Sequence, residues 1–336
     1  MKSWQLTAST GADALKLTEL AEPQPAPGQV LVRVRATSLN YRDLMVASGR
    51  YGPGVPLPLI PLSDGAGEIA AVGAGVTKWK TGDRVAGTFF QNWQTGPVRR
   101  EAFDSALGGS INGMLAEFVT LSADGVIAIP PHLSFEEAAT LPCAALTAWH
   151  ALVTDGRISA GQTALVLGTG GVSLFALQFA KMHGARVIVT SSSDAKLTRA
   201  KALGADDMIN YKTTPDWEKE VFRLTDKGGA DHVIEVGGND TFPRSLRAVA
   251  MGGTVSVIGG VSGFTSEVAL RDILGKSALI RGIFVGSRDM FAAMNRAISQ
   301  HRLKPVIDHV FSFAEAPAAY RYQESGAHFG KVVIAV

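Results

Sequence analysis

A glycine-rich turn in the middle of the chain has the residue types that bind a pyrophosphate. Glycine lets the chain turn sharply and lets backbone N–H groups approach an anion, and the next helix adds the positive end of its dipole. The third glycine of a dinucleotide fingerprint is replaced by Ser173, a residue small enough to keep helix and strand close. The segment predicts a dinucleotide site, with an ordinary strand-to-helix connection as the alternative. The turn residues are Gly168, Thr169, Gly170, Gly171 and Val172.

Polar residues further along bear on which dinucleotide would bind. The segment VTSSSDAKL contains Ser191, Ser192, Ser193 and Lys196. Hydroxyl groups and an ammonium suit the 2′-phosphate of NADP(H), whereas an acidic side chain at this place binds the ribose of NAD(H). Asp194 keeps the second interpretation open. The sequence therefore favours NADP(H) over NAD(H).

The elements that position these residues alternate regularly. Apolar runs recur between residues 163 and 286, and helix-like stretches fill most of the gaps, as βαβ crossovers require. We expect a doubly wound parallel sheet. The predicted strands are 163–168, 185–191, 208–211, 231–237, 254–260 and 278–286.

The two ends of the chain have a different character. Short alternating runs separated by turn residues fill the first part, which predicts a mainly β unit. After a predicted helix at 288–301, the segments PVIDHVFSF and GKVVIAV return to this pattern. The sequence thus predicts an α/β protein with a discontinuous domain of residues 1–123 and 289–336 around an inserted domain of residues 124–288.

Composition excludes several classes of function. The chain has 336 residues, of which 46% are hydrophobic and 18% charged, with a net charge of +2. No block of like charge could follow a nucleic acid or a lipid surface, and no apolar run is long enough to span a bilayer. Cys143, the single cysteine, cannot form an internal disulfide, and the start has no secretory signal pattern, so we expect a cytoplasmic protein.

Together these motifs resemble the medium-chain dehydrogenase/reductase superfamily, and most of all its zinc-independent quinone oxidoreductase-like branch. The resemblance runs through SLNYRDLMVASGRYG, PLIPLSDGAGEIAAVG, GMLAEFVTL, LPCAALTAWHAL, GTGGVS and GKVVIAV. It implies a GroES-like β-rich catalytic domain plus a Rossmann domain with a doubly wound parallel sheet. It also implies a homodimer that pairs the apolar segment 278–286 across a two-fold axis.

The positions of the family's catalytic zinc ligands can be followed in this chain. They fall on Asn40, Ser63 and Cys143, and the lobe that holds a structural zinc in relatives has no cysteine here, between residues 89 and 105. One thiolate cannot supply the three protein ligands of a catalytic zinc, so the sequence predicts no zinc. Cys143 is then better interpreted as a small packed residue than as a nucleophile.

Without a Lewis acid, reduction of a quinone or an α,β-unsaturated carbonyl is the easier chemistry, because hydrogen bonds to the oxygen suffice. The resemblance places Asn40, Tyr51 and, less directly, Tyr41 beside such a substrate; a turn amide and packed aromatic rings are the alternatives. The activity left open is a zinc-free alcohol dehydrogenase or aldehyde reductase. A cofactor-binding protein with little turnover is the non-enzymatic alternative.

Further cofactor contacts are expected where parallel strands end. Gly237 and Gly259 lie at such ends and allow close approach, and Arg288 is either a phosphate ligand or a solvated charge at a helix start. The resemblance adds a second set of contacts. Its members are Val285, Gly286 and Ser287 along the nicotinamide, and Thr147 and Lys331.

Overall fold

The chain folds into two compact units. A computed structural model describes residues 1–52 and 54–336. The first unit comprises Met1–Leu146 and Val285–Val336, and the second comprises Thr147–Phe284. No helix among the described residues has the length and apolarity needed to cross a membrane.

The observed boundaries between the two units differ from the predicted ones. They fall after Leu146 and after Phe284, whereas the sequence predicted them after residues 123 and 288. The stretch after residue 123 still belongs to the first unit, because β7 (Val126–Ala128) pairs antiparallel with β5 (Arg84–Gly87). A short helix, α3 (Phe135–Ala138), interrupts the alternating pattern there, so the pattern did not indicate that the first unit continues past residue 123.

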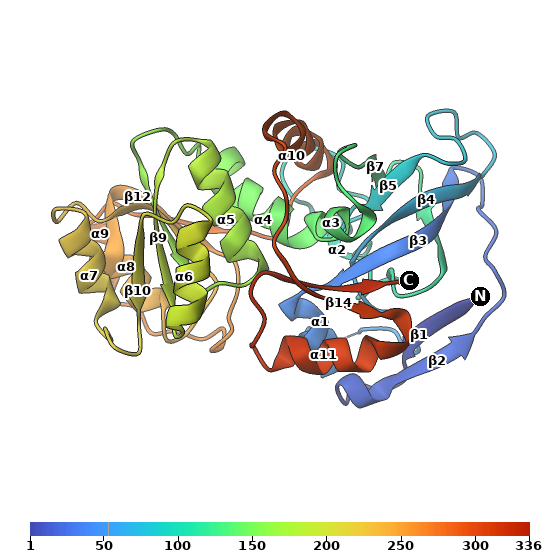
Figure 1. Cartoon of the computed structure of the whole chain (residues 1–336), viewed down its shortest axis with the longest axis horizontal. Helices are drawn as coiled ribbons and strands as arrows, with labels where there is room; N and C mark the ends of the chain where they lie inside the picture. Colours follow the sequence, from blue (N-terminus) through green and yellow to red (C-terminus); the bar gives the residue numbers. More distant parts are fainter. Residues whose placement is uncertain (53) are drawn as a thin grey trace. The chain divides into compact units, whose positions relative to one another are not determined.

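A seven-stranded sheet organises the first unit, and both ends of the chain contribute to it. β3 (Gln29–Leu39) pairs antiparallel with β4 (Asp64–Val72) and with β15 (Lys331–Ala335), seen as blue and red strands in Figure 1. The C-terminal segment therefore completes the N-terminal unit. The other elements are β1 (Lys2–Leu6), η1 (Ala12–Ala14), β2 (Leu15–Glu19), α1 (Tyr41–Ala47), α2 (Arg100–Phe103), β6 (Phe118–Ser122), η2 (Leu141–Ala145), α10 (Arg288–His301), β14 (Ile307–Ser312), η4 (Phe313–Glu315) and α11 (Ala316–Glu324).

The sequence of β3 explains its central place. Val30, Val32 and Val34 are buried in the core of the unit, whereas Arg33 and Arg35 alternate with them, as the two-residue period of a strand requires. The neighbouring strand approaches β3 very closely at Gly67. A Cβ there would lie 2.0 Å from the carbonyl oxygen of Arg33, so only glycine fits.

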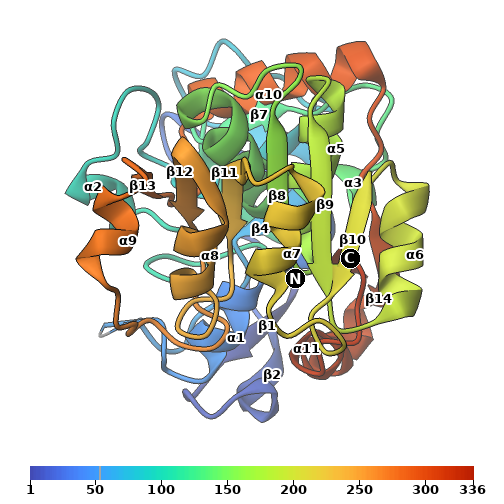
Figure 2. The same ribbon diagram turned by 90° about the vertical axis from the view of Figure 1, so that its left-hand side faces the viewer.

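A six-stranded parallel sheet forms the second unit, in the order β10-β9-β8-β11-β12-β13. This order places the first strand, β8 (Thr163–Leu167), next to the fourth, β11 (Ala230–Glu235), and creates the switch point of a doubly wound fold. The predicted fold class is therefore confirmed. Figure 2 shows the strands of this sheet and the helices along it. The remaining elements are η3 (His150–Asp155), α5 (Gly171–Met182), β9 (Arg186–Ser191), α6 (Asp194–Ala202), β10 (Asp207–Asn210), α7 (Trp217–Leu224), α8 (Phe242–Ala248), β12 (Val249–Val257), α9 (Leu270–Leu274) and β13 (Leu279–Gly282), while α4 (Leu146–Trp149) crosses the join.

Several details differ from the sequence prediction; the strand predicted at 254–260, for example, is observed as Val249–Val257. The last strand ends at Gly282, four residues before the predicted end. Ile283 still donates its backbone N–H to the carbonyl oxygen of Val257, and the buried Val285 beyond it has a φ of +52°, which a strand does not adopt. In α5, Phe175 and Phe179 are buried, whereas the predicted turn residue Val172 is half-buried.

Candidate functional site

The turn between β8 and α5 has the geometry of an anion site. Gly168 has a φ of +75°, a conformation that favours glycine. Gly170 is the N-cap of α5, and no side chain caps the helix, so the N–H groups of its first turn are not taken by a capping side chain. A Cβ built on Gly170 would meet no atom within 4 Å. The turn therefore has both donors and open space for a pyrophosphate.

Ser173 replaces the third fingerprint glycine without separating helix from strand. Its side chain is buried, and its hydroxyl donates a hydrogen bond of 2.7 Å to the carbonyl oxygen of Leu167, the last residue of β8. The hydroxyl thus ties the helix to the end of the strand.

The serine run lies where β9 ends. Ser191 is buried, and its hydroxyl accepts a hydrogen bond from the backbone N–H of Ser193. Ser193 caps α6, because its hydroxyl accepts from the backbone N–H of Lys196 at 3.4 Å. A hydroxyl that accepts in this way can still donate its own hydrogen. Ser192 follows β9 and is half-buried.

The ends of β11 and β12 also form close backbone turns. Glu235 ends β11, is fully buried, and accepts hydrogen bonds from the N–H of Gly237 at 2.7 Å and the hydroxyl of Thr241 at 2.6 Å. A Cβ on Gly259 would lie 3.0 Å from the carbonyl oxygen of Val236, so this position also favours glycine. Glu235 therefore holds this edge of the sheet together.

In the segment predicted to line the nicotinamide, Val285 has a φ of +52°, which a β-branched residue rarely adopts. Such strain persists only where the surroundings hold it, and it concentrates at functional sites. Ser287 caps α10, and Arg288 donates to the carbonyl oxygen of Val126, which favours a structural role for its charge. A Cβ on Gly286 would lie 2.9 Å from the Leu146 side chain.

The predicted substrate residue Asn40 lies in a cluster of buried charges in the first unit. Its Oδ1 accepts a hydrogen bond of 2.5 Å from the ammonium group of Lys331, which also donates to the carbonyl oxygen of Leu39 at 2.5 Å. The backbone N–H of Asn40 donates to the carboxylate of Asp43 at 2.8 Å. The Asn40 amide also interacts with the nearby carboxyl of Asp64. The cluster therefore joins β3, α1, β4 and β15.

The carboxyl of Asp64 has other partners as well. It accepts from the hydroxyl of Ser63 at 2.7 Å and from the backbone N–H of Cys143 at 3.1 Å. Burial raises the pKa of Asp64, and the nearby Lys331 opposes that rise. Burial lowers the pKa of Lys331, which Asp64 opposes in turn.

The tyrosines differ in their surroundings. Tyr51 faces the buried Arg42, whose guanidinium carbon lies 4.5 Å from the centre of the ring. Arg42 in turn forms an ion pair of 3.3 Å with Asp43, whose pKa burial raises to about 6. Tyr51 is thus linked through Arg42 and Asp43 to Asn40. Tyr41 is the first residue of α1 and is half-buried.

A zinc ion does not suit the residues at the three positions of the family's catalytic ligands. Asn40 and Ser63 offer neutral oxygens, and burial together with Asp64 raises the pKa of the Cys143 thiol, so it is protonated at neutral pH. A cation, the ammonium of Lys331, already contacts Asn40. Among residues 1–52 and 54–336, no three or more His, Cys, Asp or Glu side chains gather into a metal-binding group.

Sequence reasoning missed part of this cluster. Lys331 was expected to contact the cofactor, which stays a prediction; its bonds to Asn40 and to the carbonyl oxygen of Leu39 were not foreseen. Arg42, Asp43 and Asp64 were not predicted as site residues. A charged residue within an otherwise apolar strand, such as Lys331 in GKVVIAV, was the one signal available. Thr147, the remaining predicted contact, is buried at the start of the second unit.

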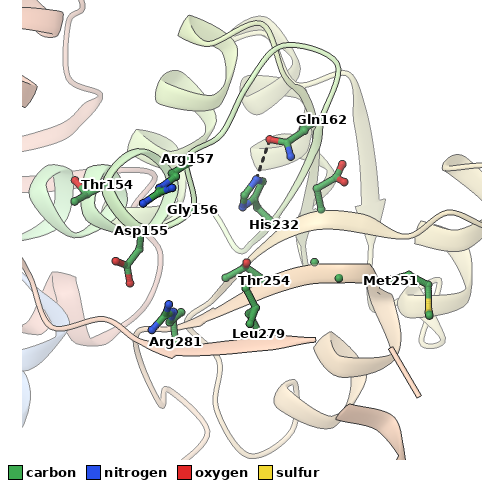
Figure 3. A pocket seen from close by; sticks show the side chains of 13 residues that line it. Thr154, Asp155, Gly156, Arg157, Gln162, His232, Met251, Thr254, Leu279 and Arg281 are labelled. Atoms are coloured by element: carbon green, nitrogen blue, oxygen red, sulfur yellow. Dashed lines mark hydrogen bonds between the residues drawn. The ribbon is translucent and has the colours of Figure 1, made fainter. Parts of the chain in front are cut away.

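A polar cavity of about 490 Å³ lies elsewhere in the second unit, at the amino ends of its strands. In Figure 3, His232 faces Gln162, and its Nε2 lies 3.1 Å from the Gln162 Oε1. Gln162 precedes β8, whereas Gly168 follows it, so the cavity is at the opposite edge of the sheet from the glycine turn. The cavity contains none of the predicted cofactor residues.

Two family models match the chain. Residues 26–131 match the alcohol dehydrogenase GroES-like domain, and residues 171–300 match the zinc-binding dehydrogenase domain. A zinc-type alcohol dehydrogenase-like protein of Schizosaccharomyces pombe is 47% identical over 97% of this chain and 96% of its own length. The chain belongs to the medium-chain dehydrogenase/reductase superfamily. It is an oxidoreductase of this superfamily of nicotinamide-dependent dehydrogenases.

Other members of the superfamily carry more specific names. A quinone oxidoreductase of Pseudomonas aeruginosa is 32% identical over 95% of this chain and 94% of its own length. A 2-methylene-furan-3-one reductase of Solanum lycopersicum is 34% identical over 99% of this chain and 79% of its own length. The resemblance to quinone oxidoreductases that the sequence indicated is thus confirmed.

Solved structures of this superfamily agree with the fold. An NAD-dependent alcohol dehydrogenase superposes with a TM-score of 0.92 at 36% identity, and each chain is covered completely. A mycobacterial protein solved with NADPH superposes with a TM-score of 0.83 at 27% identity, again over the whole of both chains. The solved relatives therefore include one named for NAD and one solved with NADPH.

Proposed function

We propose that this medium-chain dehydrogenase/reductase is a zinc-independent, NADPH-dependent reductase of quinones or α,β-unsaturated carbonyls. The observation that supports it most is the bond of the Lys331 ammonium to Asn40, the residue at one of the positions where the family resemblance implies a zinc ligand. A buried ammonium and an amide can stabilise an oxygen that gains negative charge, which is the requirement for reducing a conjugated carbonyl.

NADPH fits the observed residues of the second unit. The uncapped start of α5 and the open space at Gly170 suit the pyrophosphate, and the hydroxyls of Ser192 and Ser193 with Lys196 suit a 2′-phosphate. When bound, the nicotinamide supplies a hydride. In the first unit, Asn40 would bind the substrate oxygen and Tyr51 would pack against the substrate.

A zinc-free alcohol dehydrogenase or aldehyde reductase is the second candidate, because several relatives are named alcohol dehydrogenases. A panel assay separates the candidates. Purified protein is mixed with NADPH and with quinones, alkenals and saturated aldehydes in parallel, and the loss of NADPH absorbance is followed. Turnover of quinones or alkenals well above that of the matched saturated aldehydes is expected. The reverse preference would favour the second candidate, and NADPH binding without turnover would favour a binding protein.

We further propose a homodimer formed through the edge of the second unit's sheet. β13 is the edge strand, and Leu279 and Ile280 are 52% and 38% exposed. Leu270 and Leu274 on the preceding helix α9 are about four-fifths exposed. Proteins usually cover an apolar edge of this kind.

A further inference from the structure

The ammonium group of Lys331 has an unusual environment for a lysine. The residue is 2% exposed, and two of its three N–H donors are used by the Asn40 side chain and the carbonyl oxygen of Leu39. Lysine is almost never fully buried unless it is paired. The pairing of β15 with β3, in which Val332 lies opposite Leu39, carries Lys331 to the end of the central strand.

This bond determines which way the Asn40 amide faces. An ammonium group can donate but cannot accept, so the atom 2.5 Å from the Lys331 Nζ must be the amide oxygen. The amide nitrogen then lies on the other side. That nitrogen is buried and makes no hydrogen bond of normal geometry among the described residues, although the carboxyl of Asp64 lies near enough to interact with it. A buried donor without a partner is costly, and such groups in native proteins call for an explanation.

The acidic groups that face Lys331 come from three other elements. They are Asp64 of β4, Asp43 of α1 and Cys143 of η2. The carboxyl oxygens of Asp64 already accept from Ser63 and from the backbone of Cys143, and Asp43 accepts from the backbone of Asn40. The carboxyls of Asp64 and Asp43 favour the charged form of the ammonium, and the bond from Lys331 restrains the Asn40 amide.

We propose that Lys331 is a positioning residue: it holds the Asn40 amide so that Nδ2 donates to the substrate oxygen that gains negative charge on reduction. The inference rests on the proposed function. It differs from a cofactor-binding role, because Lys331 acts through Asn40 and not through the dinucleotide. It also differs from a purely structural tie between β15 and β3, which would lower stability without a specific effect on turnover.

Steady-state kinetics of four variants test the inference: K331M, K331R, N40A and the double variant N40A/K331M. K331M should lower kcat roughly ten- to a hundred-fold: complete loss of one donor to a developing oxyanion costs about 10² to 10³, and this variant leaves the Asn40 donor present but no longer held in place. K331R keeps the charge and the donors, so it should retain most of kcat. In the N40A background, K331M should have little further effect, because the two residues act as one unit. K16M, which changes the exposed Lys16, is the matched control and should behave as wild type.

The dependence of kcat on pH adds a further test, because a purely structural role of Lys331 would not change it. Burial lowers the pKa of Lys331 from 10.5, so its charge is lost as the pH rises through that lowered value. The kcat of wild type should fall there, and that fall should be absent in K331M. Additive effects of N40A and K331M, or a tenfold weaker NADPH affinity of K331M with kcat unchanged, would overturn the inference.

NMR keeps the test independent of activity. The side-chain amide signals of Asn40, identified by their loss in N40A, should titrate with the midpoint of the Lys331 ammonium in wild type and not in K331M. A wild type that reduces neither quinones nor enones refutes the proposed function. In that case, if the Asn40 amide signals do not titrate with the Lys331 ammonium, the proposed positioning of Asn40 by Lys331 is refuted as well.

Discussion

The carboxylate of Asp194 accepts a hydrogen bond of 2.7 Å from the side-chain amide of Asn210. This bond joins the first turn of α6 to the end of β10, and it occupies one oxygen of the acid that could otherwise bind the ribose of NAD(H). The better candidates for distinguishing NADP(H) from NAD(H) are then the serines before Asp194 and Lys196 after it. The relationship favours NADPH and leads to a direct test.

Replacing Lys196 by alanine should weaken NADPH binding and leave NADH binding nearly unchanged. A charge-assisted hydrogen bond to a 2′-phosphate contributes about 1.5 to 3 kcal/mol, so the loss should be on the order of ten- to a hundred-fold. Fluorescence titration of each cofactor into wild type and variant measures both affinities. Equal losses for the two cofactors, or a wild type that prefers NADH, would instead make Asp194 the ribose ligand.

Gly170 allows the cofactor site to be tested separately from the fold. A methyl group on Gly170 meets no protein atom within 4 Å, and the φ of −81° suits alanine. Gly170→Ala should therefore lower the free energy of unfolding by no more than about 1 kcal/mol, since alanine is a poorer N-cap than glycine. The methyl group would fill the space proposed for the pyrophosphate, so NADPH affinity should fall tenfold or more.

Gly168→Ala is the contrasting variant, because the φ of +75° at Gly168 strains any residue with a side chain. It should lose stability as well as affinity. Thermal melts and NADPH titrations of both variants give the comparison. Unchanged NADPH affinity in Gly170→Ala would remove the turn from the cofactor site.

The sequence was sufficient to predict the second unit because each strand of its sheet, including the exposed edge strand β13, carries its own apolar run. Apolar runs marked all six strands, and the helix predicted at 288–301 is observed as Arg288–His301. The last strand was predicted too long, because the apolar run continues through the buried Val285, whose φ of +52° lies outside the strand region. Apolar character indicates burial and does not by itself indicate pairing.

The charged cluster around Asn40 was beyond the reach of sequence reasoning. Lys331 and Asn40 are separated by 291 positions, and only the register of β15 against β3 brings them together. Arg42 and Asp43 lie two and three positions after Asn40, but charged residues are mostly exposed, so nothing local indicated their burial. Asn40 itself was singled out because the family resemblance places a zinc-ligand position at this residue of SLNYRD, and its contact with substrate stays a prediction.

Elemental analysis should find no stoichiometric zinc in the purified protein, and chelators should leave turnover unchanged. The physical reason is the donor set: Asn40 and Ser63 are poor zinc ligands, and the raised pKa of Cys143 disfavours its thiolate. A relative with intact zinc ligands, measured in parallel, is the control for metal recovery. One zinc per chain would contradict the argument and open Lewis-acid chemistry at this site.

The exposed edge of the second unit's sheet predicts the assembly. Light scattering at micromolar concentration should give twice the chain mass of 35.3 kDa. Ile280→Asp places a charge on the β13 edge and should produce monomers, because a buried unpaired carboxylate is costly at an interface. Val310→Asp is the matched control: Val310 is 45% exposed on β14, the edge strand of the other sheet, and this variant should remain dimeric. A monomeric wild type, or dissociation of the Val310 variant alone, would place the interface elsewhere or remove it.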